Sequence, residues 1–386
     1  MFSISIKVLN KDNRFGGRNI DVSFGSFSFK TPNRTATHKE YNAVSSLPHD
    51  ITIDNPVSEY VSSFDDRSLS AFLSGNGSFK DRKGKISVSI DKMRYFPIMS
   101  TIKIPSTRQV TQDQLMLFDQ FQKDDFEVIS IPQFEYKKID EFENLIIRFS
   151  DFARIRGQEA MPIIPLSTKL DIFKQQFNVL KKLNNDNGIC KVIGFAYANP
   201  FSHIQQFQTI YENRAENIWY HVFGVPKTPR GKSVAHIHEL QNWGLDTFSP
   251  EVRYTSPKAM RRYIMESKKI KAHEVECPKR FDAQTLGAFK EKDWIGRYGH
   301  DICCNCPVCR GKDLLAFKDV FTHDLDGSFA PSLLYGADRV HTLASGSLEF
   351  KESMESIKSD DLPAYYSEKE FTKSRELIKF LGSSLK

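Results

Sequence analysis

Short apolar runs alternate with helix-patterned segments through the middle of the chain, and this alternation constrains the fold more than any other feature. Apolar runs bounded by proline or charged residues are typical of strands buried on both faces. Four such runs occupy residues 126–131, 160–166, 191–196 and 219–225. Between the second and the third, Leu170, Phe173 and Phe177 recur at helical spacing. The repeat of about thirty residues per unit indicates parallel strands joined by crossover helices.

Two architectures have this pattern, a closed (β/α)8 barrel and an open, doubly wound sheet. Neither common glycine-rich phosphate loop occurs in the chain, which weakens the nucleotide-binding doubly wound alternative. The pattern continues with a helix at 234–243, a short strand at 245–248 and a helix that begins at Ser256 and Pro257. The 386 residues exceed the roughly 250 that one barrel takes. We therefore predict an α/β fold, a (β/α)8 TIM-like barrel with appendages.

The first 110 residues follow a different pattern. Alternating apolar and polar residues at 20–29 and 85–90 predict antiparallel strands, and the polar, basic segment 74–85 predicts a loop. We expect three regions along the chain. Residues 1–110 would form an N-terminal antiparallel sheet and the first barrel elements, 111–275 the barrel core with the active site, and 276–386 a zinc-binding subdomain and C-terminal helices.

A cysteine-rich run follows the predicted barrel. It contains three thiols at spacings of two and three residues: Cys304, Cys306 and Cys309. Three thiolates and one imidazole are a usual ligand set for structural zinc, which is tetrahedral. His341 and His323 are the two downstream candidates for the fourth ligand. Cys303 breaks the spacing, and we expect it to be a bystander.

A second histidine pattern, His236 and His238, could form the His-x-His motif of a barrel metallohydrolase with a catalytic zinc. That motif needs a strand, on which residues two apart share a face. Val234, Ile237 and Leu240 instead recur at helical spacing, which points the two histidines apart. The pattern favours a solvated helix face.

Composition predicts a cytoplasmic protein without a membrane partner. No apolar run approaches the ~18 residues of a membrane span, and residues 1–15 lack the apolar core of a signal peptide. Cys190 and Cys277 are isolated, which fits a reducing compartment. The formal net charge of +6 permits a polyanionic partner without requiring one.

Taken in order and spacing, these features resemble the tRNA-guanine transglycosylase superfamily, in which a βα barrel precedes a Cys-x-Cys-x-x-Cys run and a later histidine. The likeness covers nearly the whole chain, although only the cysteine run is individually specific. The similar segments are 25–37, 89–95, 193–196, 221–226, 244–248, 321–325 and 339–342. Their register implies that His341 is the fourth ligand of a structural Zn²⁺. The chain is most similar to the divergent DpdA-type branch, which inserts a 7-deazaguanine into DNA.

The resemblance implies a glycosyltransferase that exchanges guanine for a base such as 7-cyano-7-deazaguanine through a covalent glycosyl-enzyme intermediate. Such a double displacement needs a nucleophilic carboxylate and a second group that moves protons. We assign Asp246 as the nucleophile and Asp91 as the general acid and base, both at strand ends on the barrel rim. The family's own nucleophilic aspartate corresponds to Ser249 here.

Four residues are candidates for contact with the flipped base. Gly194 would allow close approach to the backbone, and Phe195 or Tyr95 would stack on the ring, with Ser249 nearby. The family's base-binding Asp and Gln fall near residues 131–133 and at Pro165, where this chain has different side chains.

Basic residues follow the proposed nucleophile with few acidic residues between them. Contacts to phosphates from such side chains supply affinity without sequence choice. The stretch comprises Lys258, Arg261, Arg262, Lys268, Lys269, Lys271, Lys279 and Arg280, and a second patch comprises Arg82, Lys83 and Lys85. We expect a nucleic-acid partner, with DNA favoured. A tRNA enzyme with the same chemistry, a non-catalytic transglycosylase-like partner subunit and additional partner proteins stay open.

Overall fold

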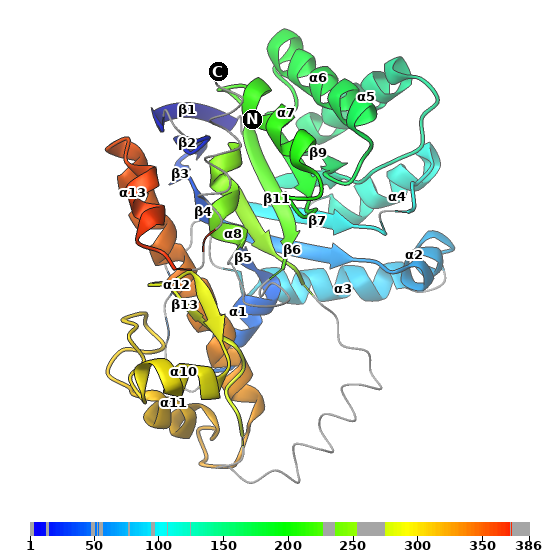
Figure 1. The fold of residues 1–386 in the computed structure, drawn as a ribbon. Coiled ribbons are helices and arrows are strands. Elements are labelled where there is room, and N and C mark those ends of the chain that lie inside the picture. The colour runs from blue at the N-terminus through cyan, green and yellow to red at the C-terminus, as the bar shows by residue number, and fades with distance from the viewer. Residues whose placement is uncertain are drawn as a thin grey trace.

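The computed structural model describes residues 4–12, 15–47, 51, 53, 57–75, 78–93, 97–105, 107–123, 125–226, 236–252, 275–370 and 372. A parallel β-barrel with helices around it forms the larger part of the molecule (Figure 1). A three-stranded antiparallel sheet lies across one end of the barrel, and a C-terminal lobe extends away from it. The predicted fold class is confirmed.

The barrel sheet contains nine strands in the order β4-β12-β11-β10-β9-β8-β7-β6-β5. β4 (Asn33–Arg34) and β5 (Ala36–Thr37) lie on either side of Thr35. The Thr35 amide donates to Phe248 O at 2.8 Å and the Ala36 amide to Val57 O at 2.9 Å, so the two short strands fill one position and close the ring. The other strands are β6 (Ser58–Ser63), β7 (Ile98–Lys103), β8 (Val128–Ile131), β9 (Glu159–Pro165), β10 (Val192–Ala196), β11 (Trp219–Val225) and β12 (Thr247–Pro250).

Helices connect successive strands on the outside of the barrel. They are α1 (His38–Val44), α2 (Asp66–Leu73), α3 (Ser78–Ile90), α4 (Gln112–Gln122), α5 (Ile139–Ile155), α6 (Leu170–Asn187), α7 (Ile204–Asn213) and α8 (His236–Glu239), which continues into the 3₁₀ helix η1 (Leu240–Trp243). The predicted helix that starts at Leu170 is α6. It buries Phe173, Phe177 and Leu180 and ends at Gly188, whose φ of +63° suits glycine at a helix C-terminus.

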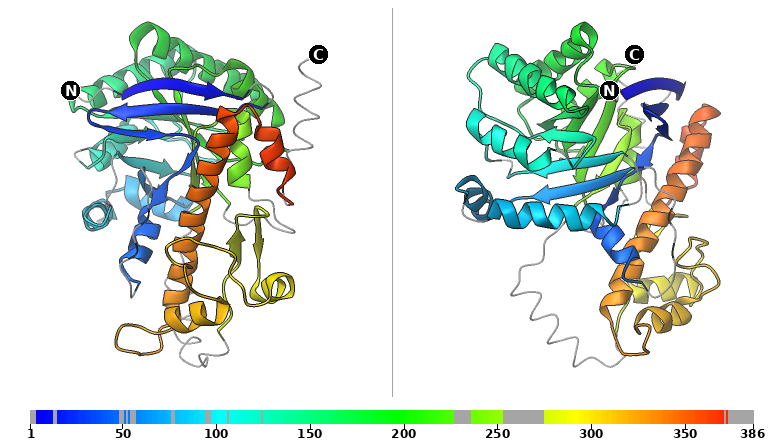
Figure 2. Two further views of the ribbon diagram at one scale, coloured as in Figure 1. Left: turned by 90° about the vertical axis from the view of Figure 1, so that its left-hand side faces the viewer. Right: turned by 180° about the vertical axis from the view of Figure 1, so that it is seen from behind.

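The N-terminal sheet closes the amino-terminal end of the barrel. β1 (Ile4–Lys11), β2 (Arg18–Phe24) and β3 (Phe27–Lys30) pair antiparallel, as predicted for 20–29. Apolar side chains of this sheet pack against residues at the strand starts: Ile20, Val22, Phe24 and Phe29 on Met99, Val128, Met161, Val192 and Trp219. Figure 2 shows this sheet in blue across the barrel. The mouth is therefore the opposite, carboxyl-terminal end of the strands.

The prediction of a strand at 85–90 and a loop at 74–85 is wrong, because α3 covers most of both segments. On a strand, Ile86 and Val88 would share a face. In the structure Ile86 is fully buried while Val88 is 62% exposed. Phe79, Ile86 and Ile90 lie at helical spacing and pack on the core, so the alternation K-I-S-V-S-I coincides with one helical stripe.

The C-terminal lobe contains β13 (Arg280–Asp282), β14 (Gly287–Phe289), α10 (Glu291–Tyr298), α11 (Leu314–Phe321), α12 (Ser332–Lys358) and α13 (Leu362–Ser367). The long helix α12 connects this lobe to the barrel (Figure 1). Phe350 of α12 stacks on Phe248 of β12 with ring centroids 5.1 Å apart, and Asn19 Nδ2 donates to Met354 O at 3.0 Å. Among the described residues, no helix is long and apolar enough to cross a membrane.

Candidate functional site

The cysteine run and α12 together form a compact cluster of metal-ligating groups. Its members are Cys304, Cys306, Cys309 and His341, whose donor atoms all lie within 4.8 Å of one another. The three Sγ atoms are 3.7, 3.5 and 3.2 Å from His341 Nδ1. A tight turn brings the last thiol back, because the Cys309 and Arg310 amides both donate to Cys306 O at 3.0 Å. The predicted ligand set is thus assembled, and it could hold a metal ion.

His341 is oriented for coordination by its second ring nitrogen. Nε2 lies 2.9 Å from the backbone oxygen of Phe281. A carbonyl only accepts, so Nε2 carries the proton and Nδ1 directs its lone pair at the thiols, the usual arrangement of a metal-bound histidine. Burial and Arg280 disfavour the charged ring, but hydrogen bonds to Cys304 and Cys306 outweigh them and raise the pKa of His341 to about 9. A divalent cation and protons therefore compete for the same donors.

Arg280 belongs to this cluster and not to a phosphate-binding surface. Its guanidinium donates to Cys309 Sγ, and it lies over the ring of Phe317 at 4.4 Å while only 2% of the residue is exposed. Three thiolates around a divalent cation leave one net negative charge, which a buried guanidinium offsets. The prediction that Arg280 contacts nucleic acid is wrong.

His323, the other candidate for the fourth ligand, and Cys303 lie outside the cluster. His323 Nδ1 contacts Asp319 O at 3.0 Å, and its ring meets Phe329 edge-on. Cys303 is not among the four clustered ligands, which agrees with its prediction as a bystander. It borders a cavity of about 280 Å³ beside Cys304.

Asp246 does not lie on the barrel rim. It precedes β12, at the amino-terminal end, and is fully buried. Its carboxylate accepts Arg18 Nε at 2.8 Å, Arg18 Nη2 at 2.7 Å and the Tyr220 amide at 2.7 Å. A carboxylate so enclosed has no approach for a substrate from the mouth, so the prediction of Asp246 as a rim nucleophile is wrong.

Asp91 is also on the wrong side. It is an exposed residue just after α3, and α3 follows β6 and precedes β7. A helix that returns from the mouth to the start of the next strand ends near the amino-terminal end of the barrel. The expected strand end at Asp91 is a helix end, and the residue is remote from the mouth.

The predicted base-contacting residues have packing roles. A Cβ at Gly194 would lie 3.2 Å from side-chain atoms of Met161 and Ile163, so the space over this glycine holds core side chains. Phe195 points to the outer helices, 6.2 Å from the rings of Phe173 and Phe177. Both predictions of base contact are wrong. Tyr95, Lys258, Arg261, Arg262, Lys268, Lys269 and Lys271 lie outside the described residues.

Two members of the second basic patch, whose third member is Lys85, stabilise the fold. Lys83 Nζ donates to Lys123 O at 3.0 Å beyond the end of α4 and pairs with Asp125 at 2.9 Å. The Arg82 guanidinium lies 4.2 Å from the ring centre of Phe64. The Lys83 ammonium group is favourable near the C-terminus of α4, and the Arg82 guanidinium makes a cation–π contact with Phe64.

The barrel interior contains a polar layer that the sequence did not predict. Glu59 of β6 and His221 of β11 are fully buried, with Oε1 and Nε2 3.4 Å apart. Thr35 Oγ1 donates to Glu59 Oε2 at 2.6 Å, and His221 Nδ1 lies 2.9 Å from Thr247 Oγ1. Burial opposes ionisation of Glu59, but His221 and the threonine hydrogen bond hold the pKa of Glu59 below its usual value. Branched apolar side chains usually fill this position in such barrels.

Lys103 and Glu251 lie above this layer, at the mouth. Met99 packs below with the N-terminal sheet, so Lys103, four residues further along β7, also points inward. Thr247 faces His221. Ser249, which is fully buried, and Glu251 lie on the same face of the chain as Thr247. Lys103 Nζ is 3.7 Å from Glu251 Oε1, and the side chains are 35% and 26% exposed.

Comparison with protein-family models gives no match, and comparison with curated proteins gives none either.

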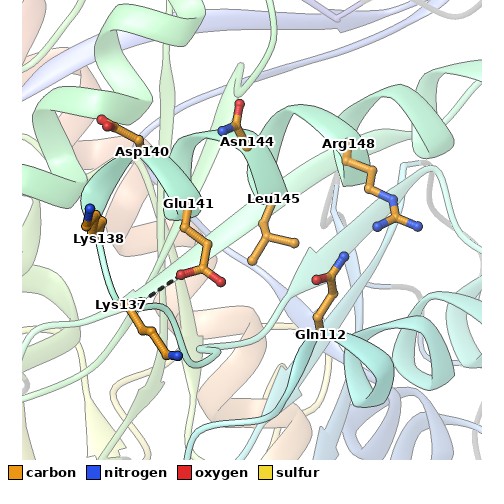
Figure 3. Close-up of a pocket in the computed structure, with 8 residues that line it drawn as sticks. All are labelled: Gln112, Lys137, Lys138, Asp140, Glu141, Asn144, Leu145 and Arg148. Carbon is orange, nitrogen blue, oxygen red and sulfur yellow. Dashed lines mark hydrogen bonds between the residues drawn. The ribbon is translucent and has the colours of Figure 1, made fainter.

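A separate cavity of about 490 Å³ lies on the outside of the barrel, between α4 and α5 (Figure 3). The Lys137 amide donates to Glu141 Oε2 at 2.8 Å at its edge. Its lining mixes both signs of charge: Gln112, Lys137, Lys138, Asp140, Glu141, Asn144, Leu145 and Arg148. Asp140 and Glu141 would repel a phosphate that the lysines attract, so we assign this cavity no function.

Proposed function

We propose that the chain is a transglycosylase that exchanges guanine in nucleic acid, with DNA favoured, for a 7-deazaguanine base such as 7-cyano-7-deazaguanine. The observation that carries the proposal is the Cys₃His cluster on the segment after the last barrel strand. That cluster is tied to the same strand through α12, where Phe350 stacks on Phe248. Barrel, cluster and their order together are what the resemblance to guanine transglycosylases implies.

Zinc is the metal we propose for the cluster. Three thiolates and one imidazole suit tetrahedral Zn²⁺, and four protein ligands leave no open position for a substrate. The ion would therefore stabilise the C-terminal lobe and its contact with the barrel, and would take no part in bond breaking.

Base exchange with retained configuration needs two successive displacements at C1′. In a (β/α)8 barrel such chemistry occurs at the carboxyl-terminal mouth. A guanine in duplex DNA would have to leave the base stack to enter it. The predicted basic stretch that begins at Lys258 would bind the phosphates of the nucleic acid.

A second candidate function is a non-catalytic, transglycosylase-like partner subunit. The position of the two predicted catalytic residues favours it, because Asp246 is enclosed by Arg18 and Asp91 lies away from the mouth. Such a subunit would keep the barrel and the metal cluster and bind nucleic acid without exchanging a base.

An exchange assay with radioactively labelled guanine distinguishes these functions. DNA and tRNA pre-loaded with radioactive guanine are incubated with the zinc-loaded protein and an excess of unlabelled 7-deazaguanine base. Loss of label from DNA supports the proposal, and loss from tRNA alone identifies a tRNA enzyme with the same chemistry. Retention of label in both, by a protein that still binds nucleic acid, supports the partner subunit.

A further inference from the structure

The Lys103 side chain crosses the barrel mouth. A Cβ on Gly224, which has a φ of +78°, would lie 3.5 Å from Lys103 Nζ. β7 and β11 are four places apart in the closed ring, so they face each other across the barrel axis. The ammonium group that begins on β7 therefore ends beside β11. The φ of +78° itself favours glycine at position 224, since a Cβ at 3.5 Å would make only an ordinary van der Waals contact with the ammonium group.

Glu251, which directly follows β12, also lies close to the Lys103 ammonium group. The Glu251 amide donates to Val225 O at 2.7 Å and so extends the pairing of β12 with β11. This extension holds the glutamate at the inner edge of the mouth. Its carboxylate lies 3.7 Å from Lys103 Nζ, above the buried Ser249 on the same face.

Exposure distinguishes Lys103 and Glu251 from the two charged pairs that are enclosed in the barrel. The Arg18–Asp246 and Glu59–His221 pairs are fully enclosed, whereas Lys103 and Glu251 are 35% and 26% exposed. A substrate that enters at the mouth can therefore reach both. Partly exposed ion pairs contribute little to stability, so this pair is dispensable for folding.

We propose that Glu251 is the nucleophilic carboxylate and Lys103 the proton donor and acceptor of the base exchange. This assignment rests on the proposed function. The substrate is a guanosine whose C1′ approaches the carboxylate while its base lies over the ammonium group. Lys103 also compensates the negative charge of Glu251 before the reaction.

Both displacements balance with these two groups. First, a Glu251 oxygen bonds to C1′, the C1′–N9 bond breaks with its electron pair going to the base, and the Lys103 ammonium protonates the departing guanine. Lys103 is then a neutral amine. Next, the incoming 7-deazaguanine gives its N9 proton to this amine, N9 bonds to C1′, and the C1′–O bond breaks to restore the carboxylate.

Three variants and a control test the assignment in the zinc-loaded, full-length protein. Glu251→Gln should lower the exchange rate by about 10³-fold or more. Lys103→Met should lower it by roughly 10² to 10⁴-fold, the usual range for loss of an acid-base group. Lys103→Arg keeps the charge but transfers no proton, so it should bind DNA normally and still be slow. Glu212→Gln, on the exposed face of α7, should match the wild type.

Intact-protein mass spectrometry after a denaturing quench provides a second measurement. Wild type should carry a nucleic-acid adduct that peptide mapping assigns to Glu251, and Glu251→Gln should carry none. Exchange by Glu251→Gln at the wild-type rate, or an adduct on another residue, overturns the assignment and leaves the proposed function intact. If wild type exchanges no base on DNA or tRNA, the proposed function itself fails, and the assignment with it.

Discussion

Arg18 and Asp246 illustrate how a single residue can be misplaced when only its neighbours in sequence are known. Asp246 is the carboxylate nearest Ser249 in the chain and belongs to the strand predicted at 245–248, which predicts a place on the barrel rim. However, the segment enters β12 at this point, so Asp246 lies at the opposite end of the barrel, where Arg18 from the N-terminal sheet meets it. Arg18 is 228 positions away from Asp246 in sequence, so no local sequence pattern predicts that they pair. The contact between Lys103 and Glu251 could not be predicted from local sequence either.

Asp246→Asn should therefore reduce stability before it affects any chemistry. Removal of one partner from a buried ion pair leaves an uncompensated charge and costs about 3 to 5 kcal/mol of unfolding free energy. Urea denaturation followed by circular dichroism measures this loss. Glu143→Gln, which breaks the exposed pair with Lys182, is the matched control and should change stability by less than about 1 kcal/mol. Similar stability of the two variants would contradict a structural role.

His238 connects stability to pH at the junction of barrel and C-terminal lobe. It is stacked between Phe281 and Phe350, with centroids 5.2 and 4.5 Å away, and burial lowers its pKa from 6.5 to about 3. Between these two values the unfolded chain binds a proton that the folded chain does not. Stability therefore falls as the pH drops from 6.5 towards 3, by up to about 1.36 kcal/mol per pH unit for one proton.

His238→Phe should remove part of this acid sensitivity, because phenylalanine keeps the stacking and does not titrate. The melting temperature of the variant should decline less between pH 7.5 and pH 5 than that of the wild type. His300→Gln, at an exposed position after α10, serves as the control. An equal decline in all three proteins would show that His238 is not responsible.

At the scale of elements, the sequence predicts those features whose determinants are local. The cysteine run fixes three ligands within six residues, and strands such as β9 and β10 are apolar enough to recognise. β6 and β7 were not predicted, because their inward positions carry Glu59, Thr101 and Lys103 and break the apolar pattern of a buried strand. The inward polar residues that make β6 and β7 difficult to recognise in the sequence also line the interior and the mouth of the barrel.

Cys306→Ala should release the metal and lower the melting temperature of the whole protein. Metal binding in such a cluster is coupled to folding, and α12 transmits the loss to the barrel. Elemental analysis should find about one zinc per wild-type chain and much less in the variant. His323→Ala should keep the metal, since this ring contacts Asp319 and Phe329 instead. Unchanged zinc content and melting temperature in Cys306→Ala would refute the centre.

For the whole molecule, the N-terminal sheet closes the amino-terminal end of the barrel, and the C-terminal lobe meets the barrel through α12. β1 to β3 pack on the strand starts, and α12, which carries His341 of the Cys₃His cluster, contacts β12 through Phe350 and Phe248. The barrel itself was predictable from the βα repeat. Which end is closed, and which charged groups face the other, depends on contacts between segments far apart in the sequence, such as the pair of Arg18 and Asp246, which are 228 positions apart.

Nucleoside analysis of the reaction product measures base exchange itself. Guanine-containing DNA is incubated with the zinc-loaded protein and 7-cyano-7-deazaguanine, digested to nucleosides and analysed by mass spectrometry, with tRNA treated in parallel. We expect a 7-deazaguanine deoxynucleoside in the DNA, with an equivalent amount of free guanine released. Absence of modified nucleoside from both DNA and tRNA, with protein that is folded and zinc-loaded, would contradict it.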